Sequence, residues 1–206
     1  RRRVWLQPIE ELLEESEKLS REYRNFEFYY FPGTGYAAGI THEKFYDPVV
    51  GRATSEDEEI LESLRQLRDV FGWSPWLRRR LFQQSAPTGL VEDSTDESWR
   101  LLSTHRPTRF NEIEYELPVD EGLKVVREVI RILDGRKEVF FPIEARYIAQ
   151  DDAWLSPFSD GPRFSVSVHA AVNESFDYFF ETLEPVFRNA GGRPHWGKLH
   201  SLRYKD

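Results

Sequence analysis

Residues 140–148 read Phe140-Phe141-Pro142-Ile143-Glu144-Ala145-Arg146-Tyr147-Ile148. This run is rich in aromatic and β-branched residues, which predicts a β-strand over residues 139–148. Side chains alternate between the two faces of a strand, so four apolar residues should share one face: Phe141, Ile143, Ala145 and Tyr147. Glu144 and Arg146 share the other face, which must therefore be exposed to water or line a polar pocket.

A second predicted strand, residues 163–172, favours the pocket. Its apolar residues alternate with a polar set, Ser165, Ser167 and His169. If the two strands are antiparallel neighbours, the side chains of Glu144, Arg146 and His169 converge on one polar surface. The sequence therefore predicts a polar site on one face of a sheet.

The composition is that of a globular protein with a real core. The chain has 206 residues, of which 39% are hydrophobic, enough for one large domain or two small ones. We expect a single domain over residues 1–206. The net charge of -8 argues against nucleic acid or an anionic membrane as the main partner.

Cysteine is absent, which excludes disulfides, thiolate zinc sites and a cysteine nucleophile, and fits a reducing, cytoplasmic setting. No apolar run approaches membrane-spanning length, and the residues after Arg1 lack the apolar core of a signal peptide. Methionine is also absent, so we expect a fragment or a processed form.

The first half of the chain predicts helices and one hairpin. A helix should begin near Pro8, and strands at residues 26–31 and 36–41 should be joined by a turn at Gly33-Thr34-Gly35. No helix start follows these glycines, so a phosphate loop is not predicted.

Further helices are predicted at residues 56–70, capped by Ser55, and at residues 76–84. Arg78-Arg79-Arg80 in the second of these could form an anion site, but a solvated helix face is the preferred interpretation. The polar residues 87–97 should form a mobile loop.

The second half of the chain has a clear order of elements. A strand at residues 109–117 and a helix at 119–133 precede the two strands described above. A helix at 174–189 and a short extended segment follow. This β-α-β-β-α-β order is the split βαβ arrangement, so we predict an α+β fold with a mostly antiparallel sheet flanked by helices.

Glu144 and Arg146 have two interpretations on residue type alone. Opposite charges on a sheet surface are commonly a structural ion pair. A guanidinium is also a fork donor suited to vicinal hydroxyls or a lactone carbonyl, while a carboxylate accepts from hydroxyls. His169 has the same ambiguity, because it could be simply hydrogen-bonded or could take a hydroxyl proton near neutral pH. No acidic or histidine cluster has ligand spacing, so no metal is expected.

A positioned segment closes the chain. His195-Trp196-Gly197-Lys198 follows Gly191-Gly192 and a proline. It could be a tail that packs Trp196 onto the core, or a functional segment held in place.

Three motifs, in this order, carry a resemblance to a known family: Phe110-Asn111-Glu112-Ile113-Glu114-Tyr115, then Glu144-Ala145-Arg146 with Asp151-Asp152-Ala153-Trp154-Leu155-Ser156, then Gly192-Arg193-Pro194-His195-Trp196-Gly197-Lys198-Leu199-His200. The chain resembles the cap, or substrate, domain of the sugar-1,4-lactone oxidase family. These are flavoproteins of the vanillyl-alcohol-oxidase type, and they include arabinonolactone, gulonolactone and alditol oxidases.

The resemblance implies roles for particular residues. Glu144 and Arg146 would hold the sugar over the flavin, with Arg146 also catalytic, and His169 would act in the pocket as base or donor. Ala171 stands where alditol-type enzymes have a hydroxyl side chain, which disfavours a linear polyol. His195 would contact FAD, and Lys198 would lie beside the reaction centre as a catalytic and cofactor-binding residue. Residues 110–115 are predicted to be structural.

The resemblance also implies partners outside this chain. Its members carry an N-terminal FAD domain, and nothing in this sequence matches one, so residues 191–206 would return toward that missing domain. The implied function is FAD-dependent oxidation of a sugar lactone or polyol CH–OH group, with oxygen as acceptor, and the chain alone would be inactive. The alternative is a stand-alone α+β binding or interaction domain without flavin.

Overall fold

The computed structural model describes residues 1–52, 57–86, 88–103 and 106–203. Its strands are β1 (Arg2–Pro8), β2 (Asn25–Phe31), β3 (Tyr36–His42), β4 (Gly89–Ser94), β5 (Phe110–Pro118), β6 (Ile143–Ile148), β7 (Arg163–Ala171) and β8 (Arg193–Pro194). Its helices are α1 (Ile9–Glu22), α2 (Asp57–Phe71), α3 (Pro75–Ser85), α4 (Ser98–Leu102), α5 (Val119–Asp134) and α6 (Glu184–Asn189), with a π-helical turn at Phe179–Leu183. None of the described helices is long and apolar enough to span a membrane.

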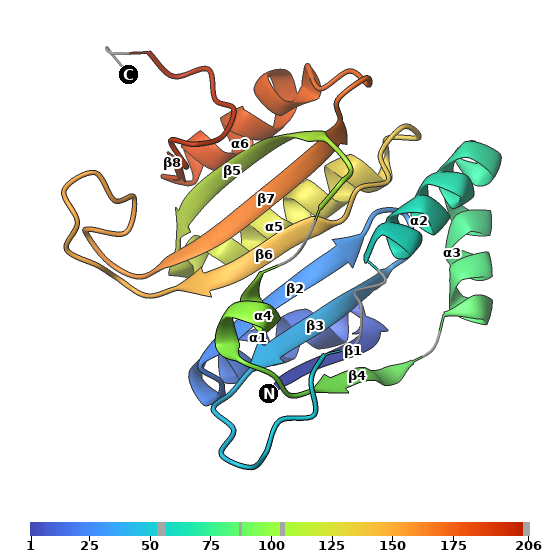
Figure 1. Ribbon diagram of the computed structural model, residues 1–206. Helices are drawn as coiled ribbons and strands as arrows, with labels where there is room; N and C mark the ends of the chain where they lie inside the picture. The colour runs from blue at the N-terminus through green and yellow to red at the C-terminus, as the bar shows by residue number, and fades with distance from the viewer. Residues whose placement is uncertain (53–56, 87, 104–105, 204–206) are drawn as a thin grey trace.

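The strands form one antiparallel sheet in the order β4-β1-β3-β2-β6-β7-β5-β8. The order is symmetric about the β2–β6 pair. In each half of the sheet, the fourth strand of a β-α-β-β-α-β unit lies at the outer edge, followed by the first, third and second strands (Figure 1). The sheet is therefore built from two units of the same strand order.

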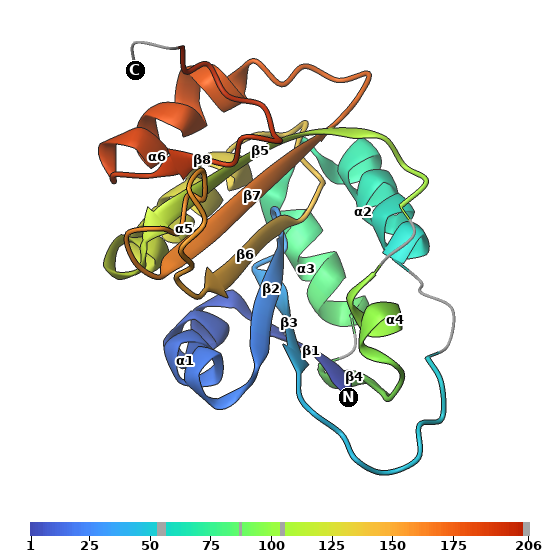
Figure 2. The ribbon, with the colours of Figure 1, turned by 60° about the vertical axis from the view of Figure 1, so that its left-hand side comes forward.

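The two halves differ in where their helices pack. α1, α5 and α6 cover one face of the sheet along its whole width, whereas α2, α3 and α4 lie on the other face, over the first half only (Figure 2). As a result, no described helix covers the second face of β6, β7 and β5. This uncovered face carries the polar residues discussed below.

The main core lies between the sheet and the helices α1, α5 and α6. Leu12 and Leu13 of α1, and Val126, Val129 and Leu133 of α5, are buried against the apolar face of the strands. Their spacing follows the helical period, so each helix buries one stripe. Gly122 allows α5 to approach closely, since a Cβ there would overlap the ring of Phe164.

A second, smaller cluster lies on the other face, beneath α2 and α3. It consists of Leu6, Phe31, Leu64, Phe140 and Phe141. The predicted strand 139–148 is wrong at its start, because β6 begins only at Ile143. Pro142 has no N–H for the sheet ladder, and Phe141 consequently lies in this second cluster instead of sharing a face with Ile143.

The α+β prediction and the order of elements in the second half are confirmed. The hairpin at residues 33–35 is also confirmed, with Gly33 and Gly35 both at a φ of 77°, which suits glycine. The predicted cap at Ser55 lies outside the described residues.

Two strands of the first half were missed, β1 and its neighbour β4 at the edge. Residues 2–8 form β1 and not merely an approach to the helix, and residues 89–94 form the edge strand β4 where a loop was predicted. β4 gives little signal because Leu90 and Val91 are exposed and its other residues are polar or glycine. Only its pairing with β1 makes it a strand.

The helix predicted at 174–189 begins later and contains a π turn just before Glu184-Pro185. Proline cannot donate to the carbonyl four residues earlier, and a wider turn suits that gap. The solvated arginine face on α3 is wrong for Arg78, which is buried beneath the hairpin turn and donates to the Val139 carbonyl at 3.3 Å.

Asp134 at the end of α5 ties that helix to the hairpin. Its carboxylate accepts from the Tyr30 hydroxyl at 2.7 and 2.8 Å and from the Gly33 N–H at 2.7 Å. We expect Asp134→Ala to lower the free energy of unfolding by about 2 kcal/mol, because it leaves buried donors without an acceptor. Urea denaturation measures this change. The exposed loop residue Asp152 provides the control. An equal effect of Asp152→Ala would contradict the prediction.

Candidate functional site

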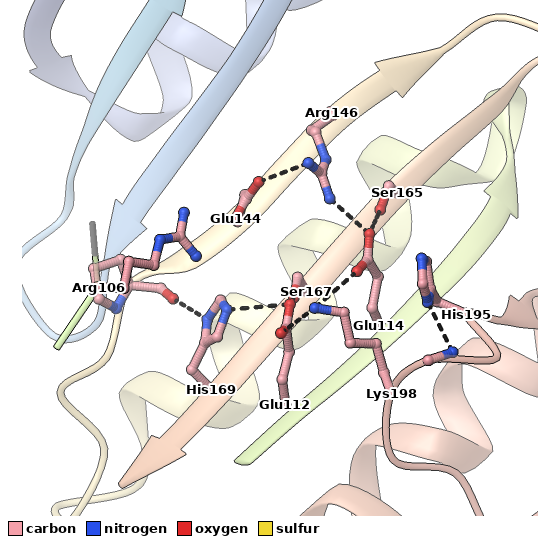
Figure 3. Close-up of polar contacts among 12 residues, drawn as sticks. Arg106, Glu112, Glu114, Glu144, Arg146, Ser165, Ser167, His169, His195 and Lys198 are labelled. Carbon is pink, nitrogen blue, oxygen red and sulfur yellow. Dashed lines mark hydrogen bonds and ion pairs between the residues drawn. The ribbon is translucent and has the colours of Figure 1, made fainter. Parts of the chain in front are cut away.

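Polar side chains from three neighbouring strands, β5, β7 and β6, meet on the uncovered face of the sheet. The β5–β7 register pairs Glu112 with His169, Glu114 with Ser167, and Glu116 with Ser165. The β6–β7 register then places Glu144 and Arg146 opposite Ser167 and Ser165. The predicted grouping of Glu144, Arg146 and His169 on one face is therefore confirmed. We call these residues, together with Lys198, the polar cluster (Figure 3).

Arg146 is held by two carboxylates. Its Nη2 donates to Glu114 Oε1 at 2.7 Å, and its Nη1 lies 3.1 Å from Glu144 Oε1. The Ser165 hydroxyl donates to the same Glu114 oxygen at 2.8 Å. Because the guanidinium is fixed from two strands, its remaining donors have a defined direction.

Lys198 reaches the cluster from a turn that is attached to β5. The His195 N–H donates to the Glu114 carbonyl and the Leu199 N–H to the Glu112 carbonyl, both at 2.9 Å. The Lys198 ammonium donates to the Glu112 carboxylate and lies 3.8 Å from Glu114 Oε2. Trp196 is exposed, so this segment is not a tail that packs its tryptophan onto the core.

The cations of the cluster lie above its carboxylates. The side chains of Arg146 and Lys198 are 36% and 29% exposed, whereas those of Glu112, Glu114 and Glu144 are 11%, 3% and 6% exposed. The surface of the cluster is thus positive, over a buried acidic layer. An electron-rich or oxygen-rich molecule placed here would meet hydrogen-bond donors first.

His169 is buried, with hydrogen-bond acceptors on both sides. Its Nδ1 lies 3.1 Å from the Pro142 carbonyl, which can only accept, so this nitrogen carries the proton. Its Nε2 faces Glu112 Oε1 at 3.3 Å, and the ring packs edge-on against Phe110. The Pro142 carbonyl thus fixes the orientation of the ring, with Nε2 turned toward Glu112.

Glu112 is held as a carboxylate. Burial alone would raise its pKa, but contacts from His169, Lys198 and Ser167 outweigh burial and hold the pKa well below the usual range. The carboxylate therefore remains a fixed negative charge beneath Lys198.

The remaining predicted residues lie at the margins of the cluster. Ala171 ends β7 and packs with the apolar cluster near Phe110. His195 lies beside β5, and its Nδ1 accepts the Gly197 N–H at 3.1 Å (Figure 3). The structure thus brings Glu144, Arg146, His169 and Lys198 together and leaves Ala171 and His195 beside them.

Several cluster residues were missed from the sequence. Residues 110–115 were predicted to be structural, yet Glu112 and Glu114 bind Lys198 and Arg146. The alternation Glu112, Glu114, Glu116 was the available signal, since a strand with three acids on one face needs cations opposite it. Glu27, which pairs in register with Arg146, was missed because nothing local links β2 to β6.

Two carboxyl groups on this face have raised pKa values. Burial, followed by the charge of Glu114, raises the pKa of Glu116 to about 8. Burial and the charge of Glu144 raise that of Glu27 to about 7. The face carries more acids than its cations neutralise, so these two acids retain protons near neutral pH.

A cavity of about 1350 Å³ adjoins the cluster. Glu27, Tyr29, Arg106 and His169 line the end that touches the cluster, and the apolar residues of the first half of the sheet line much of the rest beneath α2. Within the described ranges, no group of three or more histidine or acidic side chains could hold a metal ion.

Comparison with known proteins assigns the chain to a family. The family model described as D-arabinono-1,4-lactone oxidase matches residues 1–206. The chain belongs to this family.

Individual relatives match only part of the chain. The L-gulono-1,4-lactone dehydrogenase of Mycobacterium tuberculosis is 34% identical over 116 residues, which is 55% of this chain and 27% of that protein. The L-gulonolactone oxidases of Scyliorhinus torazame and Mus musculus are 27% and 24% identical, over 45% and 56% of this chain and 22% and 28% of those proteins. The aligned region thus spans about a quarter of each relative.

The buried proton on Glu116 predicts a pH dependence of stability. The pKa of Glu116 is about 8 in the folded protein, whereas an unperturbed glutamate has a pKa of 4.5. Between these pH values the folded state binds a proton that the unfolded state has lost, so the protein loses stability as pH rises. The loss is about 1.4 kcal/mol per pH unit.

We expect Glu116→Gln to remove this contribution from the slope, because its amide cannot ionise, while the contribution of Glu27 remains. Urea denaturation at several pH values measures it, with Glu14→Gln on the exposed side of α1 as the matched control. The same slope in both variants would show that Glu116 does not hold the proton.

Proposed function

We propose that this chain is the substrate-binding cap domain of an FAD-dependent oxidoreductase that oxidises a CH–OH group of a sugar 1,4-lactone. The observation that carries the proposal is the pair of partly exposed cations, Arg146 and Lys198, fixed over buried carboxylates on the uncovered face of the sheet. Family membership and the names of the lactone-oxidising relatives support it.

The proposal requires a second domain. Because the aligned regions span about a quarter of the relatives, we propose that an N-terminal FAD domain lies in the rest of the protein. Residues 191–206, of which 191–203 are described, would lead from the cap toward it. This chain holds only one side of the active site.

The residues present fit a flavin on that side. A partly exposed ammonium such as that of Lys198 suits the electron-rich pyrimidine end of the ring, and His195 lies beside it. The Gly33–Gly35 turn is part of a hairpin and not a pyrophosphate loop, so the chain would contact the ring and leave the phosphates to the other domain. When bound, FAD supplies the hydride acceptor that no side chain can provide.

Arg146 and Glu144 would orient the lactone. The guanidinium can donate to a ring hydroxyl or the lactone carbonyl, while Glu144 can accept from a neighbouring hydroxyl. Glu114 holds Arg146 from the opposite side, which limits its movement during binding. Correct placement of a bound substrate is itself a large catalytic contribution.

Lys198 would stabilise negative charge that develops beside it. Its pairing with Glu112 keeps the ammonium in place before the substrate arrives, and a preorganised charge needs no reorganisation during reaction. His169 would donate from Nδ1 to the Pro142 carbonyl and turn Nε2 toward Glu112 and the substrate, as base or donor.

A lactone suits the site better than a linear polyol. Ala171 offers no hydrogen bond where a polyol would need one. Phe110 and Phe141 make the part of the site around Ala171 apolar. The relatives include a dehydrogenase as well as oxidases, so the proposed acceptor, oxygen, should be tested beside an artificial dye.

The alternative of a stand-alone binding domain is not favoured, because the family match extends over the whole chain. A yellow chromophore in the complete purified protein would support the flavin proposal. A colourless protein that neither binds added FAD nor oxidises lactones would contradict it.

We expect Lys198→Ala to slow flavin reduction by a sugar lactone about 100-fold in the complete enzyme, the usual effect of removing one preorganised donor. Rapid-mixing absorbance under anaerobic conditions measures the rate. Lys124→Ala removes an exposed lysine on α5 and should leave the rate unchanged. An unchanged rate in Lys198→Ala, with the fold intact by circular dichroism, would exclude this role.

A further inference from the structure

The polar face does not end at Arg146 but continues onto β2. The β2–β6 register places Glu27 opposite Arg146 and Tyr29 opposite Glu144. Both side chains also line the cavity that adjoins the cluster. This strand belongs to the other half of the sheet, so the two halves meet in the site.

Arg106 completes this group from the segment before β5. Its Nη2 lies 3.5 Å from the Tyr29 hydroxyl, and it lines the same end of the cavity. In the close-up, Arg106 lies on the Glu144 side of the cluster, away from Lys198 and His195 (Figure 3). The group therefore offers an acid, a phenol and a guanidinium on the side farthest from Lys198.

Glu27 is not needed to hold Arg146 in place. Arg146 already has two carboxylates, Glu114 and Glu144, and the Glu27 carboxylate has no hydrogen-bond partner among the described residues. Its surroundings contain one like charge, Glu144, and three cations, Arg2, Arg106 and Arg146. A half-buried carboxyl group that lines a cavity and has no fixed hydrogen-bond partner is typical of a functional position.

The spacing between β2 and β6 suits the exocyclic chain of a sugar lactone whose ring is bound at Arg146. Neighbouring strands are about 5 Å apart, so Glu27 and Tyr29 lie one strand beyond a ring bound at Arg146. A short exocyclic chain can span that step. A carboxyl group and a phenol both accept and donate hydrogen bonds, which suits hydroxyl groups.

We propose that Glu27, Tyr29 and Arg106 form a subsite that binds the exocyclic hydroxyl groups of the sugar lactone. The inference rests on the proposed function, and it adds that chain length beyond the lactone ring is recognised by the first half of the sheet. The subsite positions and selects the substrate and takes no part in the chemical step.

The test compares 1,4-lactones of six-, five- and four-carbon sugar acids, which carry two, one and no exocyclic hydroxyl groups. In the complete enzyme, we expect Tyr29→Phe and Glu27→Ala each to lower kcat/KM about tenfold for the six-carbon lactone, mainly through KM. The four-carbon lactone should change less than twofold. Glu27→Gln should recover most of the loss, because its amide retains the shape and both hydrogen-bonding functions.

Glu14→Ala and Glu14→Gln on α1, which covers the opposite face of the sheet, are the matched controls and should leave all three lactones unaffected. Equal losses for all three lactones in the Glu27 and Tyr29 variants would overturn the subsite.

Binding measured separately from turnover distinguishes failure of the subsite from failure of the proposed function. Calorimetric titration of the anaerobically reduced enzyme, which cannot oxidise the lactone, gives Kd for each variant. If the wild type turns over no lactone, the proposed function fails. A length-dependent rise in Kd for the six-carbon lactone in Tyr29→Phe would still support the subsite, and unchanged Kd values would overturn it.

Discussion

The structure depends on the burial of several carboxylates on one face of a β-sheet. Glu112, Glu114 and Glu144 are almost removed from water, which is costly for a charge unless opposite charges and hydrogen bonds compensate. Arg146 and Lys198 provide that compensation. The pairing holds each cation in place from below, so the interaction that makes the acids tolerable also makes the cations rigid.

The repeated strand order explains why this face is available. Each half of the sheet comes from a β-α-β-β-α-β unit, but the second crossover of the first unit lies on the opposite face from that of the second unit. Helices therefore fill the second face in one half and leave it uncovered in the other. The polar cluster occupies the uncovered half, and the cavity lies where the two halves meet.

The uncovered face carries more carboxyl groups than its nearby cations can neutralise. Glu116 and Glu27, at opposite sides of the cluster, take up the excess by retaining protons. Their positions differ, since Glu116 is fully buried whereas Glu27 is partly exposed and lines the cavity. This difference is why Glu116 concerns the stability of the fold and Glu27 concerns the recognition of a ligand.

Local rules account for what could be predicted without coordinates. The alternation along the predicted strands 139–148 and 163–172 correctly placed Glu144, Arg146 and His169 on one face, because a strand's period of two is a property of its own backbone. The helix predicted at residues 119–133 followed equally from nearby residues. The motifs pointed to the family that the comparison identified.

Which strands become neighbours depends on packing between distant segments. The approach of Glu114 to Arg146, and of Glu27 to the same arginine, requires β7 to lie between β5 and β6, and β2 to join the two halves. No periodicity in one strand specifies its partner. The acidic layer beneath the cations, the protons on Glu116 and Glu27, and the edge strand β4 therefore emerge only when the whole chain folds.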